Sequence, residues 1–287
     1  RSYYMLGEKF RELRKQQGIS IIKASEGITS ASSLQRWENN KGEMSIEKVI
    51  NLLNRINIRP NEFLAKAGLT DLNIIEAKIR KAYQESDLKE LEKIANSLLT
   101  AHDLQPKNQD LLIKAAIACN YYMDLSNKNL FPQNDALQLR KILNSMKYWN
   151  QTKVSIFGNS ILILPVQDIQ EISHSLLGYL IYQDNTHTFH IMAVNTLINA
   201  VVSLLKAKQP RAAYKLLTEL NHLHLPERYS NEIIKIKFFN SFFEYLETGD
   251  KYIMDSFFHN LSALWLTKQI ADFKLGLSQL EEIYSPS

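Results

Sequence analysis

The sequence predicts an all-α fold with a small N-terminal domain and a larger helical-repeat region, and three observations lead to this prediction. Hydrophobic residues recur at helical spacing along the chain, and no alternating strand pattern persists between the helical segments. The 287 residues include 9 glycines and 7 prolines, too few for the many tight turns of a β-sandwich or barrel. A hydrophobic fraction of 45% with 22% charged residues excludes intrinsic disorder of the whole chain.

The chain begins with an amphipathic helix, which we expect over residues 5–17. Leu6, Phe10 and Leu13 share one face of this helix, and its outer face is basic. Gly18 follows as the stop signal, because glycine readily adopts the left-handed conformation that ends many helices.

Two short helices joined by a glycine-containing turn come next. Ser20 is the expected cap of the second helix, which ends at Gly27, and Ser30 caps a third helix that runs to about Asn39. This arrangement predicts a helix-turn-helix.

Two further helices complete the N-terminal unit. Ser45 is the expected cap of the fourth helix, and Pro60 opens a fifth that contains Phe63 and Leu64. The hydrophobic residues of the fourth helix that we expect to point inward are Ile46, Val49, Ile50, Leu52 and Leu53.

Positive charge is concentrated in this unit. Residues 1–67 carry 12 Lys and Arg against 7 Asp and Glu, whereas residues 68–287 carry 22 Lys and Arg against 23 Asp and Glu. The N-terminal end of the chain would therefore attract a polyanion.

Leucine-rich helical segments fill the rest of the chain. Residues 209–220 align with residues 249–260, and their offset of 40 residues suits a helix-pair repeat of the tetratricopeptide or HEAT class. Stacked helix pairs form a curved solenoid whose concave face binds extended peptides. The expected helices lie at residues 73–85, 87–101, 109–125, 134–149, 153–163, 166–183, 187–207, 210–223, 229–247, 251–266 and 268–284.

Three runs of residues carry a family resemblance. LGEKFRELRKQQG at residues 6–18, SASSLQRWENNKGE at residues 30–43 and RPNEFL at residues 59–64 resemble a Cro/Xre-type DNA-binding domain. With the helical region behind it, the chain resembles the Rgg group of the RRNPP peptide-pheromone receptors, including the stretch at residues 149–159. The resemblance implies a cytoplasmic, dimeric transcription regulator of a Gram-positive bacterium.

The resemblance also implies roles for individual residues. Arg14 and Glu38 match a buried ion pair between the first and third helices, so a structural role for Arg14 stands beside a DNA contact. Trp37 is expected in the core. Two departures are Ile21, where the superfamily often has a DNA-contacting glutamine, and Asn40, where a turn glycine is usual. Asparagine tolerates the left-handed conformation, so the second departure is mild.

The third helix is the expected recognition helix. The resemblance places Ala31, Ser32 and Arg36 toward the major groove, and the Arg36 fork can donate two hydrogen bonds to a guanine. The alternative for Arg36 is a phosphate contact or a solvated side chain. The other candidate DNA-binding residues, which would position the domain or cap its helices, are Arg14, Lys15, Ser20, Ser30, Ser33, Gln35, Asn39 and Lys41.

Some Rgg relatives carry a cysteine in the fourth helix that forms an intersubunit disulfide. Ile46 matches that place here, so we expect no crosslink at this position.

The expected helices at residues 187–206 and 232–247 carry more hydrophobic surface than one neighbouring layer would cover, and this surplus predicts a groove for a hydrophobic peptide. Asn195 and Asn199, four residues apart, would hold the peptide backbone, as asparagines do in the RRNPP receptors. The alternative is that both asparagines are satisfied inside the bundle and that the aromatic residues are core. The candidate peptide-binding residues are Met192, Asn195, Asn199, Val202, Phe238, Phe239 and Phe242.

Neither an enzyme active site nor a cofactor site is recognisable in the sequence. The chain has no glycine-rich phosphate loop, no GxSxG and no HExxH. The pairs His187 with His190 and His222 with His224 lack further ligands at suitable spacing, so we expect no metal. Cys119, the single cysteine, lies in a hydrophobic run and is expected to be an inert buried thiol in a reducing compartment.

Residues 185–205 contain no charged side chain and approach the length of a membrane span. Histidines and asparagines interrupt this stretch, and each would be unfavourable in hydrocarbon. We therefore expect a buried core helix and no membrane partner.

These observations predict a sequence-specific DNA-binding transcription regulator without enzyme activity. Residues 1–67 would bind operator DNA at an inverted repeat, residues 68–72 would form a linker, and residues 73–287 would dimerise and bind a short hydrophobic signalling peptide in quorum sensing. The alternative is a helical-repeat adaptor or antitoxin-like module that binds proteins and senses no peptide. Salt dependence separates the two, because phosphate contacts release counterions.

Overall fold

The computed structural model describes residues 6–68, 74–182 and 186–284, and within these residues it contains helices and no β-strand. The all-α prediction is therefore confirmed for the described part of the chain. The chain divides into two compact units, Arg1–Lys78 and Ile79–Ser287. The linker expected at residues 68–72 lies outside the described residues except for Gly68, as does Met5 of the first expected helix.

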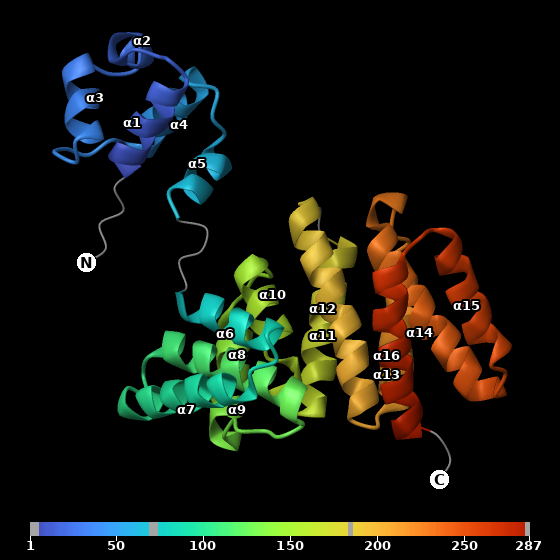
Figure 1. The fold of residues 1–287 in the computed structure, drawn as a ribbon. Coiled ribbons are helices and arrows are strands. Elements are labelled where there is room, and N and C mark those ends of the chain that lie inside the picture. The colour runs from blue at the N-terminus through green and yellow to red at the C-terminus, as the bar shows by residue number, and fades with distance from the viewer. Residues whose placement is uncertain (1–5, 69–73, 183–185, 285–287) are drawn as a thin grey trace. The chain divides into compact units, whose positions relative to one another are not determined.

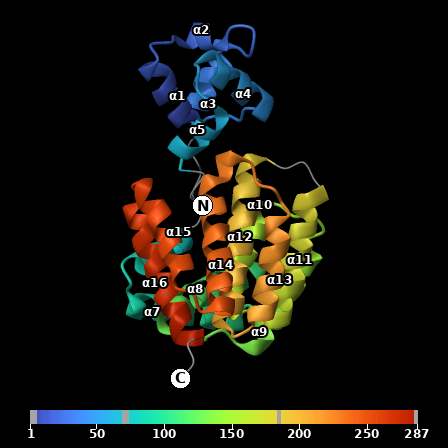
Figure 2. The ribbon, with the colours of Figure 1, turned by 90° about the vertical axis from the view of Figure 1, so that its right-hand side faces the viewer.

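Five helices form the first unit, and their bounds agree with the expected ones to within about two residues (Figures 1 and 2). They are α1 (Leu6–Gln16), α2 (Ile21–Ser25), α3 (Ala31–Glu38), α4 (Ile46–Arg55) and α5 (Pro60–Lys66).

The local signals that set these helices behave as predicted. Ser20, Ser30 and Ser45 each precede a helix, and each side chain accepts a hydrogen bond from the backbone N–H three residues further on. Asn40, after α3, has a φ of 57°, the left-handed conformation that asparagine tolerates.

The core of the first unit lies between α1, α3, α4 and α5. Phe10 and Leu34 are fully buried, and the rings of Phe10 and Trp37 have centroids 5.4 Å apart, so Trp37 is a core residue as expected. Gly7 brings α1 close to α3, since a Cβ at this position would overlap the Trp37 carbonyl group. Backbone packs directly on backbone at this contact.

One prediction for α4 is wrong. Val49, Leu52 and Leu53 are buried, but Ile46 is 65% exposed and Ile50 is 38% exposed. Successive residues of a helix are about 100° apart, so Ile50 lies off the buried stripe. Ile46 is the first residue of α4, and it is not part of the hydrophobic core cluster of the first unit.

The second unit contains the remaining helices, with α6 starting just before the unit boundary. The helices are α6 (Ile74–Gln84), α7 (Leu88–Leu104), α8 (Gln109–Ser126), α9 (Gln133–Ser145), α10 (Gln151–Gly158), α11 (Val166–Tyr182), α12 (His187–Lys206), α13 (Pro210–Asn221), α14 (Ser230–Thr248), α15 (Tyr252–Ala263) and α16 (Thr267–Tyr284), with short 3₁₀ turns at Ile161–Ile163 (η1) and Glu227–Tyr229 (η2).

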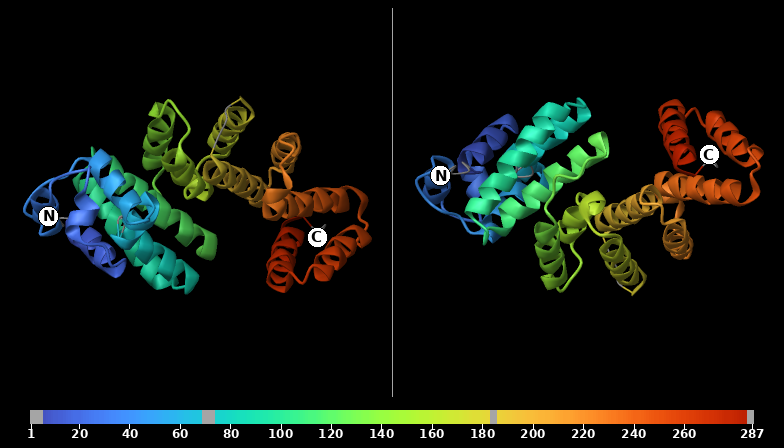
Figure 3. Two further views of the ribbon diagram at one scale, coloured as in Figure 1. Left: turned by 90° about the horizontal axis from the view of Figure 1, so that it is seen from above. Right: turned by 90° about the horizontal axis from the view of Figure 1, so that it is seen from below.

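Neighbouring helices of this unit pack as consecutive pairs. The largest contact joins α7 and α8, and α12 packs on α10, α11, α13 and α14. Figure 3 shows these helices in a bending row that runs from α6 and α7 in teal, through α12 in gold, to α15 and α16 in red. A row of this kind is the helical-repeat architecture that the sequence predicts.

The expected helix at residues 134–149 is shorter in the structure and ends at Ser145. Lys153 explains the difference, because its Nζ donates to the Met146 carbonyl at 2.8 Å and lies 4.4 Å from the Trp149 ring. The chain from Met146 to Trp149 folds around this buried lysine instead of continuing as helix. Burial lowers the pKa of the Lys153 ammonium.

The uncharged segment forms α12, the one helix of the described residues that is long and hydrophobic enough to cross a membrane. Ala193, Leu197 and Leu204 are fully buried among neighbouring helices, which confirms the expected core helix over the described residues. Cys119 is likewise fully buried, and burial raises the pKa of its thiol to about 12.

Candidate DNA-binding face and ligand pockets

The exposed face of α3 presents several of the candidate DNA-binding residues together. Ser32, Ser33, Gln35 and Arg36 are exposed, and Ala31 is half-buried. Arg36 makes one weak intramolecular contact, 3.4 Å from Nη2 to the Lys41 carbonyl, so most of its guanidinium donors stay available.

The Arg14–Glu38 ion pair that the family resemblance implies is present. Arg14 Nε donates to Glu38 Oε1 and Nη2 to Oε2, both at 2.7 Å, and both side chains are buried. Arg14 Nη1 donates to the Ile19 carbonyl at 2.7 Å. All three nitrogens are thus engaged inside the unit, and the geometry supports the structural alternative for Arg14 rather than a DNA contact.

Other candidates hold local structure and remain exposed. Ser30 Oγ lies 3.0 Å from Ser32 Oγ and 2.8 Å from Ser33 Oγ, in addition to capping α3. Asn39 donates to the Gln35 carbonyl and accepts from Arg11 Nη1, both at 2.8 Å. Lys15, Ser20 and Lys41 are exposed, and Ser20 caps α2.

Sequence reasoning missed Arg11 and Arg55 as positioning residues. Arg55, in the last turn of α4, donates to the carbonyls of Lys23 and Glu26 at 3.0 Å each. These carbonyls stand at the end of α2, where no intrahelical donor follows. Arg55 therefore fixes the turn before α3, through contacts between residues about 30 positions apart that no periodicity reveals.

In the second unit, the two candidate asparagines have different surroundings. Asn195 is half-buried and lies between two side chains of α14: its Nδ2 donates to Glu232 Oε1 at 2.8 Å, and its Oδ1 accepts from Lys235 Nζ at 2.6 Å. Asn199 is exposed and lines a pocket with Val202. The geometry supports the structural alternative for Asn195 and leaves the amide of Asn199 at a pocket wall.

The phenylalanines of α14 lie in the core. Phe238, Phe239 and Phe242 are buried, and the Phe238 ring stacks on Phe273 of α16 with centroids 4.7 Å apart. Their hydrophobic surplus is covered by α15 and α16, so the packing matches the core alternative. Met192 is half-buried.

The pocket that contains Asn199 has a volume of about 330 Å³ and lies between α6, α8, α10, η1 and α12. This volume falls within the range of small-molecule and peptide side-chain sites. Its lining residues are Tyr83, Asn120, Tyr121, Asp124, Gly158, Asn159, Ile161, Leu162, Asn199, Val202 and Lys206.

One wall of this pocket is a polar cluster. The Tyr83 hydroxyl donates to Asp124 Oδ2, and Lys206 Nζ donates to Asp124 Oδ1 at 3.0 Å. Burial, followed by the hydrogen bond to Asp124, raises the pKa of the Tyr83 hydroxyl. The cluster joins α6, α8 and α12 through one carboxylate.

A second pocket of about 180 Å³ adjoins the first, because Asp124, Leu162 and Lys206 line both. We call the two together the Asn199 groove. Its further lining residues are Met123, Asn127, Leu164, Val166, Ile169, Ser203 and Ala207.

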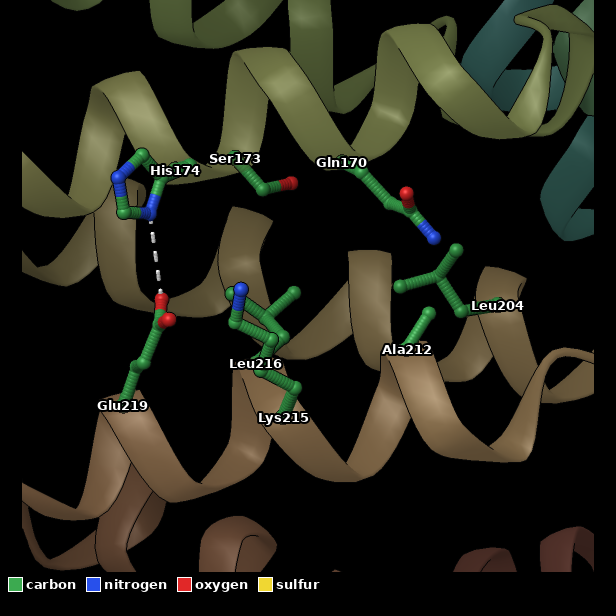
Figure 4. Close-up of a pocket in the computed structure, with 8 residues that line it drawn as sticks. All are labelled: Gln170, Ser173, His174, Leu204, Ala212, Lys215, Leu216 and Glu219. Carbon is green, nitrogen blue, oxygen red and sulfur yellow. Dashed lines mark hydrogen bonds and ion pairs between the residues drawn. The ribbon is translucent and has the colours of Figure 1, made fainter.

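A separate pocket between α11, α12 and α13 is shown in Figure 4. His174 Nδ1 and Glu219 Oε2 lie 3.5 Å apart across its mouth, and the Ser173 side chain extends between the helices. Its volume of about 140 Å³ is too small for a peptide, so it is not the better candidate for a peptide site.

Comparisons with known proteins agree with this architecture. Residues 88–274 match the family described as HTH-type transcriptional regulator Rgg, C-terminal domain, and residues 10–63 match a helix-turn-helix family. The comparison with curated proteins gives no match.

Solved structures with the same fold extend over nearly the whole chain. The Streptococcus dysgalactiae SHP pheromone receptor Rgg2 has a TM-score of 0.72 at 16% identity, covering 96% of this chain and 99% of its own. A putative transcriptional regulator from Listeria monocytogenes EGD-e has a TM-score of 0.71 at 15% identity, covering 97% of both chains. A bacterial peptide pheromone/receptor complex has a TM-score of 0.68 at 14% identity, covering 99% of both chains.

The family match covers well over half of the chain, and the second match coincides with the five-helix unit. The family consists of transcription regulators rather than enzymes. This chain therefore belongs to the Rgg family of helix-turn-helix transcriptional regulators.

Proposed function

We propose that this regulator binds a specific operator through α3 and senses a short hydrophobic peptide in the Asn199 groove. The observation that carries the proposal is the groove itself, in which the exposed Asn199 and hydrophobic side chains line two adjoining pockets. Support comes from the fold shared with Rgg2, which is a SHP pheromone receptor. In this proposal residues 1–67 bind DNA, and residues 73–287 form the regulatory part.

The DNA-binding half of the proposal rests on α3. Arg36 has the exposure and the free donors for a bidentate contact to a guanine in the major groove. The exposed Ser33, Gln35, Asn39 and Lys41 would donate to phosphate oxygens, whereas Ser30, whose hydroxyl donates to Ser33, would hold the start of α3. One such unit is small, so two copies in a cytoplasmic homodimer would read an inverted repeat.

The peptide-binding half rests on complementary chemistry in the groove. The Asn199 side chain offers two N–H donors and one carbonyl oxygen acceptor to a peptide backbone. Ile161, Leu162 and Val202 offer hydrophobic contacts. The Asp124–Lys206 pair presents both signs of charge to the ends of a short peptide.

Coupling between peptide and DNA would pass through α6, the first helix after the linker region. Tyr83 attaches α6 to the groove through Asp124, so a ligand that engages Asp124 or Lys206 competes with this contact. A peptide that binds the protein more tightly when α6 is in one position than when it is in another shifts the population of molecules toward the first position.

The experiment begins with operator selection from a random duplex library, followed by fluorescence anisotropy at several salt concentrations with and without peptide. A synthetic peptide encoded by a short hydrophobic reading frame next to the gene is the ligand. We expect saturable DNA binding that weakens steeply with salt, and a peptide-dependent change in operator affinity. Salt-insensitive binding to a protein partner, with no selected operator, would favour the adaptor alternative.

Light scattering tests the assembly. We expect a dimer at micromolar concentration and a symmetric footprint with half-sites one helical turn, about 34 to 36 Å, apart. A monomer with an asymmetric footprint contradicts this arrangement.

A further inference from the structure

A second pocket region of the repeat unit lies away from the Asn199 groove. It is lined by the end of α7, the start of α8 and the C-terminal half of α9, and it has a volume of about 480 Å³. It shares no lining residue with the groove, and about 17 Å of α8 separates Gln109 here from Asn120 there. The lining residues are His102, Pro106, Lys107, Gln109, Leu112, Gln138, Lys141, Ile142 and Ser145.

The charged lining residues of this pocket carry a single sign. Lys107 lies just before α8 and Lys141 lies on α9, and no carboxylate is among the lining residues. Neither lysine forms an ion pair with another described residue. Their charge is therefore available to a ligand.

The first turn of α8 adds a positive potential. This helix is 18 residues long, and Asn108 caps it by accepting from the Leu111 N–H. The N–H of Gln109, in the first turn, has no intrahelical acceptor, and Gln109 lines the pocket. Helix N-termini bind oxyanions through these N–H groups and the helix dipole.

His102 supplies an independent observation. It is 2% exposed and lines the pocket, and its buried Nδ1 has no hydrogen-bond partner among the described residues. Its other ring nitrogen, Nε2, lies 3.9 Å from Asp135 Oδ1, and Asp135 is not a lining residue of the pocket. Buried polar atoms in native proteins are nearly always paired, so the unpaired Nδ1 points to a ligand that completes it.

We propose that this pocket is a binding site for a small organic phosphate. The phosphoryl group would lie between Lys107, Lys141 and the first turn of α8, and His102 would be a further donor. Leu112 and Ile142 form the hydrophobic part of the wall, and they would contact the organic group.

Phosphate fits this donor set better than a carboxylate. Two ammonium groups, an imidazole, a helix N-terminus and two amides line the pocket, which is more than the two oxygens of a carboxylate can use. The Ser145 hydroxyl donates to the Ile142 carbonyl at 2.8 Å, so it is not one of the donors. A phosphomonoester carries close to two negative charges and three acceptor oxygens at neutral pH. The volume exceeds what an inorganic phosphate ion needs, which leaves room for the organic group.

Isothermal titration calorimetry of the full-length protein with inorganic phosphate and with phenyl phosphate tests the site directly. We expect saturable binding of one phenyl phosphate per chain, tighter than inorganic phosphate because the ring contacts Leu112 and Ile142. Absence of saturable binding of either probe at millimolar concentration overturns the proposal. Equal affinity for the two probes overturns the assignment of an organic phosphate.

Charge variants locate the bound anion. Lys141→Gln and Lys107→Gln should each weaken phenyl phosphate binding about tenfold, since each removes a charge-assisted contact. Lys89→Gln, on the exposed first turn of α7, is the matched control and should leave affinity unchanged. A similar loss in all three variants would show non-specific attraction and overturn the site.

His102→Asn tests the imidazole, with circular dichroism as the check that the protein is folded. We expect weaker binding with the helical signal retained. If this variant does not fold, the two exposed lysine variants still decide the outcome. The measurement needs neither operator nor peptide, so its result is independent of the proposed peptide sensing.

Discussion

The two units differ in how completely their buried polar side chains are hydrogen-bonded. In the first, the buried Arg14 and Glu38 form an ion pair with each other, and residues 6–68 contain no buried side-chain nitrogen or oxygen that lacks a hydrogen-bond partner. In the second, His102, Asp168, Ser173 and His190 each keep such an atom. A fully paired interior favours one rigid arrangement, whereas an unpaired group that lines a pocket, as His102 and Ser173 do, can gain a partner when a ligand binds. This difference fits the proposed function, in which a rigid DNA-binding unit is joined to a unit that responds to a ligand.

Breaking the interior of the first unit should have the largest effect. Glu38→Gln leaves the Arg14 charge without its counter-charge inside the unit, which should destabilise it by about 3 to 5 kcal/mol. Hydrogen exchange of the α1 and α3 amides measures this loss in the full-length protein. The double variant Arg14→Met with Glu38→Leu is the control, and it should recover most of the protection. Unchanged exchange in Glu38→Gln would show that the pair does not hold α3.

Operator recognition should be the next most sensitive property. Arg36→Ala should lose about 1 to 3 kcal/mol of affinity for the best selected operator and relax the preference at one base pair. Lys41→Ala, a phosphate contact in this proposal, should weaken all sequences alike and reduce the salt dependence. Anisotropy with a set of single-base operator variants separates the two patterns. Equal operator binding by wild type and Arg36→Ala would contradict the assignment of Arg36 as a base-reading residue.

The two asparagines of α12 give a matched comparison within the second unit. Asn199→Ala should cost about 1 to 3 kcal/mol of peptide affinity without changing stability, because it leaves a bound peptide amide unpaired. Asn195→Ala should instead lower the free energy of unfolding, since Glu232 and Lys235 both lose a partner. Calorimetry and chemical denaturation of both variants are the measurements. Unchanged peptide binding in Asn199→Ala would place the peptide elsewhere.

The smallest expected effect concerns the contact between α6 and the groove. Tyr83→Phe removes one hydrogen bond to Asp124 and keeps the ring on Tyr121, so it should change stability by only about 0.5 to 1.5 kcal/mol. Its informative effect is on coupling: the peptide should alter operator affinity less than in the wild type. A peptide response identical to that of the wild type would show that coupling does not depend on this bond.

Local signals made most of the fold predictable. Ser20, Ser30 and Ser45 mark helix starts through hydrogen bonds that span three residues, and Asn40 marks a turn through its own backbone preference. The Arg14–Glu38 pair was predictable only through family resemblance, because its partners are 24 positions apart.

The features that could not be predicted from the sequence depend on contacts between residues far apart in the chain. Periodicity assigns a hydrophobic residue to a face but not to a neighbour, and so it overestimated the buried stripe of α4 at Ile46 and Ile50. The same limit applies to Asn195 and Asn199, which share a stripe of α12 but differ in what α14 places beside them. The end of α9 at Ser145 depends on Lys153, eight residues beyond it.

The close approach of Gly7 to the Trp37 carbonyl has a consequence for how operator preference can diverge among related regulators. The last turn of α3 packs main chain against main chain on α1, through the backbone of Trp37 and Glu38 and not through the side chains of Ser32 or Arg36. Exchanging Ser32 or Arg36 leaves this contact unchanged, so in the proposed mode of DNA binding new base preferences can be acquired one substitution at a time. The absence of a side chain at Gly7 thus makes the packing of α3 independent of Ser32 and Arg36, the residues proposed to contact bases.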